Sequence, residues 1–511
     1  MGTKQYDKKA VWSSTTDSKT YPPLSGNIKA EIAIVGAGIT GLSVAYHLAK
    51  AGKNVVILEQ YQVGKGTTGS STGNLYAPID ERLFSIGSKH NEDAMRMVAK
   101  SRTAAIAFIE QRVQEYGLDC GYHRVPWHLF TTPDTNSQNS QVQKEKEAAI
   151  KAGLKVSDTI PVNFPFEVEA LLTIDQQAQF NPLKYVQQLA ASIAGGNCRI
   201  YENTQVTKVE DGVPCTVHTA NGTVKAEKVV MATHSPKGIY GVHTAMEPYR
   251  EYALAVRLKG ELPAPGVYWH VQSGPQYSIR PYRNEHGNYL LVLGEPHKVG
   301  NKSSNEDSLK KVEAYLRAHF EVEEIEYSWA AQNYKPADNL PYIGTSPLQT
   351  NTYLATGFAA DGLTYGTLSG MIISDSILGK DNPWAELYDP KRFTPVASAT
   401  KFIKENVTVA THLLKDYLFY GQAKELKEIK AGEGKTIKLN NERLAAYRDD
   451  QGKIHVVSGI CTHMGCIVHW NNAEKSWDCP CHGSRFSVDG QVLEGPAYTG
   501  LAKPDDDTLS E

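Results

Sequence analysis

The sequence predicts an α/β protein with more than one domain, and three observations support this fold class. Residues 31–58 alternate strand, glycine-rich turn, helix and strand. Charged helical segments and strand-like segments then interleave up to about residue 395. After residue 425, short strand-like segments are separated by Gly and Asp turns. We therefore expect a large α/β region followed by a small all-β domain.

The length and composition are those of a soluble globular protein. The chain has 511 residues, a formal net charge of −3 and 41% hydrophobic residues, which predicts two to four domains at about 100–200 residues each. No basic block marks a nucleic-acid partner, and no apolar run reaches the roughly 18 residues of a membrane span. The first residues lack the apolar core of a signal peptide. We expect a cytoplasmic protein without a nucleic-acid partner or a membrane span.

Composition shifts divide the chain into four segments. Residues 1–25 are polar and form an arm that we expect to be peripheral. Residues 26–395 form the α/β domain, which ends in a stretch with three prolines. Residues 396–424 show helical spacing and are predicted to form a linker helix that packs against a domain; an interfacial membrane helix is the alternative. Residues 425–511 form the small β domain.

The first chemical motif is a glycine-rich turn between a strand and a helix. Gly36-Ala-Gly38-Ile-Thr-Gly41 follows the strand over residues 31–35, and Glu59 ends the next strand. In this context Gly36 permits a tight turn, Gly38 lets the backbone approach a pyrophosphate, and Gly41 lets helix and strand pack closely. Glu59 would accept hydrogen bonds from a ribose. The pattern predicts a Rossmann-like dinucleotide site, which both FAD and NAD use.

A family resemblance favours FAD. The chain resembles the D-amino-acid oxidase, glycine oxidase and sarcosine oxidase family in the segments 66–75, 179–182, 229–233, 329–338, 341–344 and 357–362. This resemblance implies non-covalent FAD, because no cysteine lies near the flavin loops, and an amine or amino acid as substrate. It further implies that the flavin contacts come from Thr68, Gly73, Asn74, Gly357 and Gly362.

The resemblance also implies a substrate subdomain interleaved with the FAD-binding domain, at about residues 86–165 and 240–325. Within it, Arg280 lies where the family often places a carboxylate-binding arginine, and a planar guanidinium can hold a carboxylate with two hydrogen bonds. A structural salt bridge is the alternative role for Arg280. Two departures from the family pattern are visible: His234 replaces a small residue, and Ala359-Ala-Asp361 replaces Ser-Gly-His.

The second chemical motif consists of two Cys/His boxes near the C-terminus. Cys461-Thr-His463 and Cys479-Pro-Cys-His482 supply two thiolates and two imidazoles. Two cysteinates on one iron and two histidines on the other make a Rieske [2Fe-2S] cluster. The alternative on the same four residues is a tetrahedral zinc site.

A second cysteine in each box favours the cluster over zinc. With Cys466 and Cys481, the boxes resemble the disulfide-bearing Rieske proteins of respiratory and photosynthetic complexes. The resemblance implies a Cys466–Cys481 disulfide, which is rare in the cytosol unless the loops shield it. It also implies a hydrogen bond from Ser484 to a cluster sulfur, which Phe486 cannot supplement where the relatives carry Tyr, and a covering loop at Gly495-Pro496.

The two motifs together resemble FAD-dependent oxidoreductases of bacilli that carry a C-terminal Rieske domain. Our first hypothesis is a dehydrogenase in which the flavin oxidises a C–N bond and passes electrons to the cluster and then to an unidentified acceptor. A reductase with electrons entering through the cluster is the first alternative. A non-enzymatic redox sensor is the second.

Overall fold

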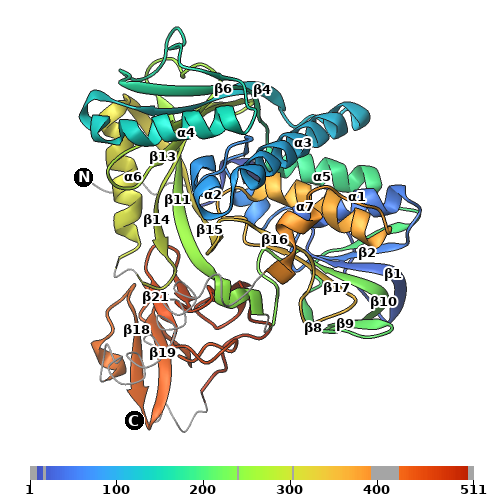
Figure 1. Cartoon of the computed structure of the whole chain (residues 1–511). Helices are drawn as coiled ribbons and strands as arrows, with labels where there is room; N and C mark the ends of the chain where they lie inside the picture. Colours follow the sequence, from blue (N-terminus) through green and yellow to red (C-terminus); the bar gives the residue numbers. More distant parts are fainter. Residues whose placement is uncertain (1–7, 15–18, 239–240, 302–303, 393–424, 505–511) are drawn as a thin grey trace.

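The computed structural model describes residues 8–14, 19–238, 241–301, 304–392 and 425–504. Within these ranges the chain forms a sheet covered by helices, a second large sheet, and a small β domain that is drawn in orange and red in Figure 1. The linker helix predicted for residues 396–424 lies outside the described residues. The α/β fold class and the small C-terminal β domain are confirmed.

The first sheet has a parallel centre. Its strands, in spatial order, are β16 (Tyr342–Thr345), β17 (Thr352–Thr356), β10 (Gly222–Met231), β1 (Ile28–Val35), β2 (Val55–Leu58) and β7 (Cys198–Tyr201), with β9 (Cys215–Thr219) and β8 (Val206–Glu210) added beside β10. β1 pairs in parallel with β2 on one side and with β10 on the other. The strand order therefore reverses at β1, and the carboxyl ends of the three strands open one crevice.

The helices of the described residues cover the first sheet and flank the second (Figure 1). They are α1 (Ile39–Lys50), α2 (Leu83–Lys89), α3 (Glu92–Tyr116), α4 (Asn139–Lys151), α5 (Pro182–Ile193), α6 (Glu306–His319), α7 (Gly362–Ile377) and α8 (Ala385–Tyr388). Figure 1 shows α1, α5 and α7 on one face of the first sheet. The longest helix of the described residues, α3, begins where the Asn91 side chain accepts a hydrogen bond from the Ala94 amide and ends at Gly117 with φ +58°.

The second sheet is mostly antiparallel. Its strands, in spatial order, are β15 (Val322–Pro336), β11 (Met246–Leu258), β14 (Gly287–Lys298), β13 (Tyr277–Asn284), β12 (Val267–His270), β4 (His123–Thr131), β6 (Ala170–Gln179) and β3 (Asn74–Leu75), with β5 (Val156–Ser157) beside β6. The second sheet extends beyond the substrate subdomain predicted at about 86–165 and 240–325, because β6 pairs with β4 and most of β15 pairs with β11. These strands pair with partners far away in the sequence, and the hydrophobic pattern of each segment does not reveal such partners.

The C-terminal domain consists of two small antiparallel sheets. The strands are β18 (Gly434–Leu439), β19 (Glu442–Arg448), β20 (Ile454–Ser458), β21 (His469–Asn471), β22 (Ser476–Asp478), β23 (Arg485–Phe486) and β24 (Val492–Glu494). Trp477 and Phe486 are fully buried between the sheets and pack with the cysteines of both boxes. The hydrophobic core of this small domain thus supports the two boxes directly.

The prediction that the N-terminal arm is peripheral is wrong for residues 10–12. Trp12, in a short 3₁₀ turn, is fully buried, and its indole nitrogen donates to the Ser71 carbonyl at 2.8 Å. An indole of this size contributes a large apolar area when it is buried. The arm therefore belongs to the core beneath residues 70–72, although its own sequence is polar.

A buried ionic cluster joins the C-terminal domain to the second sheet. Arg250 on β11 is 2% exposed and forms a two-pronged ion pair with Glu474 and a 3.1 Å contact with Glu494. Arg485 contacts the same two carboxylates at 3.1 Å each. Burial opposes ionisation of Glu474, but the charges of Arg250 and Arg485 lower the pKa of Glu474 to about 2. These pairs fix the β domain against the strand.

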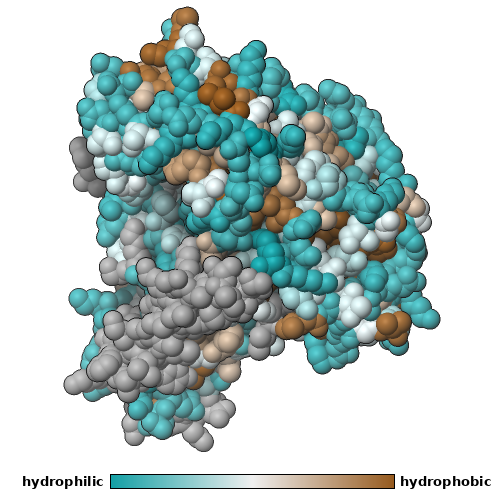
Figure 2. Space-filling view, viewed as in Figure 1, coloured by the Kyte–Doolittle hydropathy of each residue, from teal (hydrophilic) through white to brown (hydrophobic). Residues whose placement is uncertain are grey.

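The face drawn in Figure 2 is mostly hydrophilic, and its hydrophobic residues form small separate groups. Across the described ranges, none of the helices combines the length and the apolar composition needed to cross a membrane.

We expect Arg250→Ala to loosen the β domain. The substitution removes one of the two buried arginines that pair with Glu474 and Glu494. Loss of one partner of a buried ion pair costs roughly 3–5 kcal/mol, and the remaining Arg485 places the expected loss at the lower end of that range. Thermal unfolding followed by the visible circular dichroism of the cluster should show a lower midpoint. The Glu474 contribution is complete above its ordinary pKa of about 4.3 and is lost as the pH falls toward 2, so the difference between variant and parent should shrink in acid.

The matched control is Lys298→Ala, which removes a partly exposed ion pair with Glu247 elsewhere on β11 and β14. Such a pair contributes about 0–1 kcal/mol. Equal shifts in the two variants would contradict a special role for Arg250.

Candidate functional site

The glycine-rich turn opens the crevice at the end of β1. Gly36 has φ +105°, and a Cβ atom there would lie 2.5 Å from the Ala232 carbonyl oxygen. A Cβ at Gly41 would lie 2.0 Å from the Gly36 carbonyl oxygen, so the helix packs directly on the turn. Gly38 lines a cavity at the start of α1, where backbone amides face the crevice. The three glycines therefore occupy the positions that a pyrophosphate site requires.

Glu59 lies at the end of β2, beside this turn. Its two carboxylate oxygens accept hydrogen bonds from the Ala37 amide at 2.8 Å and the Tyr61 amide at 2.9 Å. Burial raises the pKa of Glu59. The carboxylate lines the cavity and retains lone pairs for further donors, as a ribose diol would supply. The position fits the predicted contact with a ribose.

Lys237 is a cavity residue that the sequence analysis missed. Its Nζ donates to the Gln60 side chain at 3.0 Å, and burial lowers the pKa of Lys237 to about 8 against the opposing charge of Glu59. A buried ammonium at this end of the cavity can attract an anionic group. No local motif surrounds Lys237 in the sequence, so only the fold brings it to the glycine turn.

The flavin-facing loop predicted from residues 66–75 lines the cavity and contacts α1. Thr68 Oγ1 accepts a hydrogen bond from the Ile39 amide at 3.1 Å. Gly73 has φ +72°, and a Cβ there would lie 2.3 Å from the Phe180 carbonyl oxygen. Asn74, on β3, lines the cavity where this loop joins the second sheet. Thr68, Gly73 and Asn74, the predicted flavin contacts of this loop, therefore line one cavity.

Three side chains hold this loop from behind by its consecutive carbonyls. The indoles of Trp329 and Trp12 donate to the Ser70 and Ser71 carbonyls, each at 2.8 Å. Arg280 donates to the Thr72 carbonyl at 2.6 Å. The loop is thereby fixed by groups from the second sheet and from the N-terminal arm.

Arg280 therefore lies behind the loop rather than in the cavity. It is 1% exposed, also donates to the Phe180 carbonyl at 3.2 Å, and lies 5.5 Å from the Trp12 ring. Burial lowers the pKa of Arg280 to about 9. Ser278, two residues earlier on the same face of β13, does line the cavity, whereas the loop covers Arg280. The structure does not place Arg280 where a substrate carboxylate would bind.

The second predicted flavin loop precedes α7. Gly357 has φ +77°, and a Cβ there would lie 2.8 Å from Pro336. Gly362 begins α7 and lines the cavity together with Ala359 and Leu363. A helix start at the cavity wall provides backbone amides for an acceptor group. Gly362 thus contacts the cavity directly, and Gly357 shapes the turn behind it.

The two positions that depart from the family pattern, at His234 and Asp361, make specific side-chain contacts. The His234 ring lines the cavity, lies 3.2 Å from Thr67 Oγ1 and packs against Tyr334. Asp361 is buried in an ion pair with Arg102 at 2.9 Å. Arg102 also donates to the Tyr76 carbonyl at 2.8 Å, and Tyr76 lines the cavity. Through Arg102, Asp361 therefore helps to hold the backbone at Tyr76. Asp361 therefore has a structural role in place of the usual histidine.

The cavity continues from the glycine turn to the second sheet, and its walls fit FAD. Glycines without room for a side chain, two helix starts and Glu59 line one end, and polar and aromatic side chains of the sheet line the other. The sheet residues in the wall are Asn74, Glu251, Trp269, Ser278, Leu293, Ala331, Gln332 and Asn333. Leu493, Glu494 and Gly495 of the β domain also line it.

The two Cys/His boxes form a single buried centre. The rings of His463 and His482 lie 5.0 Å apart, and the Nδ1 atom of each is buried without a hydrogen-bond partner among the described residues. The thiols of Cys461 and Cys479 hydrogen-bond each other, and this contact lowers the pKa of Cys461 to about 7 although burial opposes the change. Burial lowers the pKa of His482 to about 4, which keeps its imidazole neutral for a metal.

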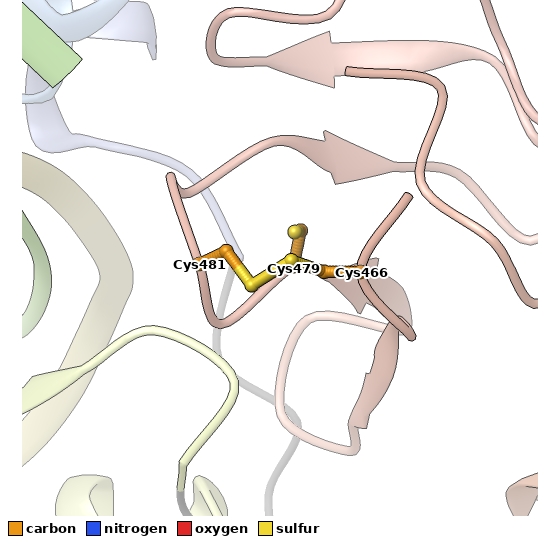
Figure 3. A group of neighbouring side chains, drawn as sticks. All are labelled: Cys466, Cys479 and Cys481. Atoms are coloured by element: carbon orange, nitrogen blue, oxygen red, sulfur yellow. A yellow bond between two sulfur atoms is a disulfide. The ribbon is translucent and has the colours of Figure 1, made fainter. Parts of the chain in front are cut away.

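These four side chains are the donor set that we propose for the cluster. The sulfur atoms of Cys466, Cys479 and Cys481 lie within 4.8 Å of one another (Figure 3). Cys466 and Cys481 form the predicted disulfide, however, so neither offers a thiolate. Both are at most 5% exposed. Two free thiols and two unpartnered imidazole nitrogens fit the two-cysteine, two-histidine set of a Rieske cluster.

Ser484 and the loop at Gly495 pack on the centre as predicted. The Ser484 hydroxyl hydrogen-bonds the thiol of Cys461, which favours the thiolate, and its Oγ accepts from the Ala497 amide at 3.2 Å. A Cβ at Gly495 would lie 2.7 Å from the Ser484 Cα atom, so the loop covers the second box closely. Phe486 is fully buried and offers no second hydroxyl.

The centre faces the α/β region through three contacts that sequence reasoning missed. His463 Nε2 lies 3.1 Å from the Gly238 carbonyl oxygen. The His243 ring lies 5.2 Å from that of His463. Gln332 on β15 donates to the Gly483 carbonyl at 2.8 Å, one residue after His482. These contacts join segments more than a hundred residues apart, which local patterns do not reveal.

We expect Gly38→Val to release FAD. A Cβ at this position would lie 2.9 Å from Thr68 Oγ1, and the branched side chain would enter the cavity. Overpacking of about 1–3 kcal/mol corresponds to roughly 5- to 150-fold weaker binding. The flavin-to-protein ratio should fall while the iron content is unchanged. Gly260→Val, at an exposed site with nothing within 4 Å, is the control and should retain FAD. Full flavin content in Gly38→Val would contradict this placement.

We expect Ser484→Ala to lower the cluster potential with full cluster occupancy. A hydrogen bond to a ligating sulfur stabilises the more negative reduced state, and the substitution removes that bond. Protein-film voltammetry measures the potential. The matched variant Ser487→Ala removes a hydroxyl that accepts from the Gln491 amide at 3.1 Å in a turn of the same domain, and it should leave the potential unchanged. An unchanged potential in Ser484→Ala would mean that the hydroxyl does not act on the cluster.

Comparisons with known proteins agree with both halves of this site. Residues 31–376 match the family described as FAD dependent oxidoreductase, and residues 420–505 match the Rieske [2Fe-2S] domain. The chain is 32% identical to the Rieske 2Fe-2S iron-sulfur protein YhfW of Bacillus subtilis, over 99% of this chain and 100% of that protein. It is 26% identical to gamma-glutamylputrescine oxidoreductase of Escherichia coli, over 70% of this chain and 86% of that protein.

Among solved structures, glycine oxidase from Geobacillus kaustophilus superposes with a TM-score of 0.58 at 21% identity, over 70% of this chain and 98% of that one. This likeness concerns the fold of the first two sheets. The two family matches assign FAD to the α/β region and a [2Fe-2S] cluster to the C-terminal domain. The chain belongs to the FAD dependent oxidoreductase family and carries a C-terminal Rieske domain.

Proposed function

We propose that the protein is a cytoplasmic dehydrogenase that oxidises the C–N bond of an amine or amino acid and passes the electrons through its cluster to an external acceptor. The observation that carries this proposal is the shared wall of the cavity. Glu494 and Gly495, which follow the second Cys/His box, line the same cavity as the glycine turn and the flavin-facing loop. The two redox sites are therefore neighbours within one chain.

A short path of covalent bonds and one hydrogen bond connects the cavity to the second Cys/His box. Gln332 lines the cavity and donates to the Gly483 carbonyl, which lies next to His482. The Arg250 ion pairs hold the β domain in this position. When bound, FAD supplies a two-electron acceptor and the cluster a one-electron carrier. A fixed contact of this kind supports electron transfer without movement of the β domain.

The substrate class is supported by the names of the relatives. Oxidation of a CH–NH group to C=N removes two electrons and two protons, and the named relatives act on glycine or gamma-glutamylputrescine. The polar and aromatic residues on the sheet wall, among them Trp269, Ser278 and Asn333, suit a small polar molecule. The acceptor is a separate molecule that takes electrons from the cluster.

We expect Cys461→Ser to separate the two half-reactions. The substitution removes one iron ligand and the cluster, while the cavity residues remain in place. Substrate should still bleach the flavin in anaerobic stopped-flow measurements. Steady-state turnover with a one-electron acceptor should fall by about tenfold or more, because the reduced flavin loses its exit for single electrons. Cys215→Ser, at another buried free thiol distant in sequence from the boxes, is the matched control.

Either of two results would contradict the proposal. Unchanged acceptor turnover in Cys461→Ser would place the cluster off the electron path. Loss of flavin reduction with FAD still bound would mean that electrons enter through the cluster, as in a reductase.

A further inference from the structure

The second sheet contributes one charged side chain to the described wall of the cavity. Among the described residues that line the cavity from the second sheet, Glu251 on β11 is the one charged side chain. The other charged groups in the wall lie elsewhere: Glu59 and Lys237 are at the glycine turn, and Glu494 belongs to the β domain. The sheet therefore presents a carboxylate to the cavity.

The alternation of β11 explains why this carboxylate faces the cavity. Successive side chains of a strand point to opposite faces, so Arg250 faces the β domain and Glu251 faces the cavity. Glu251 is 7% exposed, and its Oε1 accepts a hydrogen bond from the Asn333 side chain at 3.1 Å. Asn333 itself lines the cavity. The carboxylate is thus held in a fixed orientation by a neighbouring strand.

The cations near this end of the cavity are held by other groups. Arg280 donates to two backbone carbonyls behind the loop. Arg82 donates to the Asp80 carbonyl at 2.7 Å and to the Gln276 side chain, and it stacks on Trp269. Lys335 lies 2.8 Å from Glu81 and 3.6 Å from Asp80, and its charge also acts on Glu251 without an ion pair between the two. None of the three is among the residues that line the cavity.

We propose that Glu251 binds the ammonium group of the substrate, and that the substrate is a cationic amine without a carboxylate on the reacting carbon. The inference rests on the proposed function and narrows its substrate class. A buried carboxylate needs a nearby positive charge, which an ammonium ion in the cavity supplies, whereas the carboxylate of an α-amino acid would be repelled. Trp269 and Leu293 provide apolar walls beside it for the carbon chain.

The protonation of Glu251 agrees with an incoming cation. Burial, followed by the charge of Asp80, raises the pKa of Glu251 to about 7, against the opposing charge of Lys335. In the free protein, the positive charge near Glu251 therefore does not fully compensate the burial of its carboxylate. A bound ammonium ion favours its ionised form.

Two probes of the same shape and opposite charge test the inference. Tert-butylammonium and pivalate both carry a tert-butyl group. The carbon attached to the charged group has no hydrogen in either probe, so neither can be oxidised there. Each is titrated into the FAD-loaded protein by calorimetry and by changes in flavin absorbance. We expect tert-butylammonium to bind about tenfold tighter than pivalate or more. Glu251→Gln should abolish this preference, and Glu251→Asp, which keeps the charge, should retain part of it.

Glu247→Gln is the matched control. It removes a carboxylate from the same strand that does not line the cavity, and it should keep the preference of the parent. Flavin content and far-UV circular dichroism show whether each variant is folded. Tighter binding of pivalate, binding of neither probe, or an unchanged preference in folded Glu251→Gln would overturn the inference.

Failure of the proposed function is a separate result. If the ammonium probe binds through Glu251 but no amine bleaches the flavin without oxygen, the proposed function fails and the amine site stands. If α-amino acids bleach the flavin equally well in the parent and in Glu251→Gln, the proposed function stands and the amine site fails.

Discussion

The structure depends on the pairing of Arg250, a charged side chain that is almost completely buried. Its partners, Glu474 and Glu494, come from the β domain, so the charge is compensated only when the two parts of the chain are in contact. Glu494 also lines the cavity. A single ion-pair cluster therefore fixes the β domain and completes the wall of the FAD cavity. The cost of separating these charges makes a permanently attached β domain the stable arrangement.

The same strands that hold the β domain also line the cavity at the end formed by the second sheet. On β11, Arg250 and Glu251 are adjacent and point to opposite faces, one to the ion-pair cluster and one to the cavity. On β15, Gln332 donates to the loop of the second box, and Asn333 donates to Glu251. The register of two paired strands thus sets the distance between the Glu251 carboxylate and the loop of the second box.

The sequence predicts the parts of the site that are local. Gly36, Gly38, Gly41 and Glu59 fall within one β-α-β unit, and each Cys/His box is a few residues long, so spacing alone identifies them. Arg280 differs, because its position on β13 is predictable but the loop that covers it is not. Lys237, Glu251 and Trp12 come to the site through long-range pairing and packing, for which a single sequence offers no periodic signal.

The orientation of the centre bears on how electrons leave it. The outer nitrogen of His463 is engaged by the Gly238 carbonyl, so this imidazole edge is turned toward the chain's own α/β region and is not offered to an external partner. On either side of His463, however, Thr462 and Met464 are exposed, the latter by 47%. The first box therefore contacts Gly238 through His463 and reaches the solvent through Thr462 and Met464. Under the proposed function, electrons would arrive from the cavity side and leave at the exposed rim of the same loop.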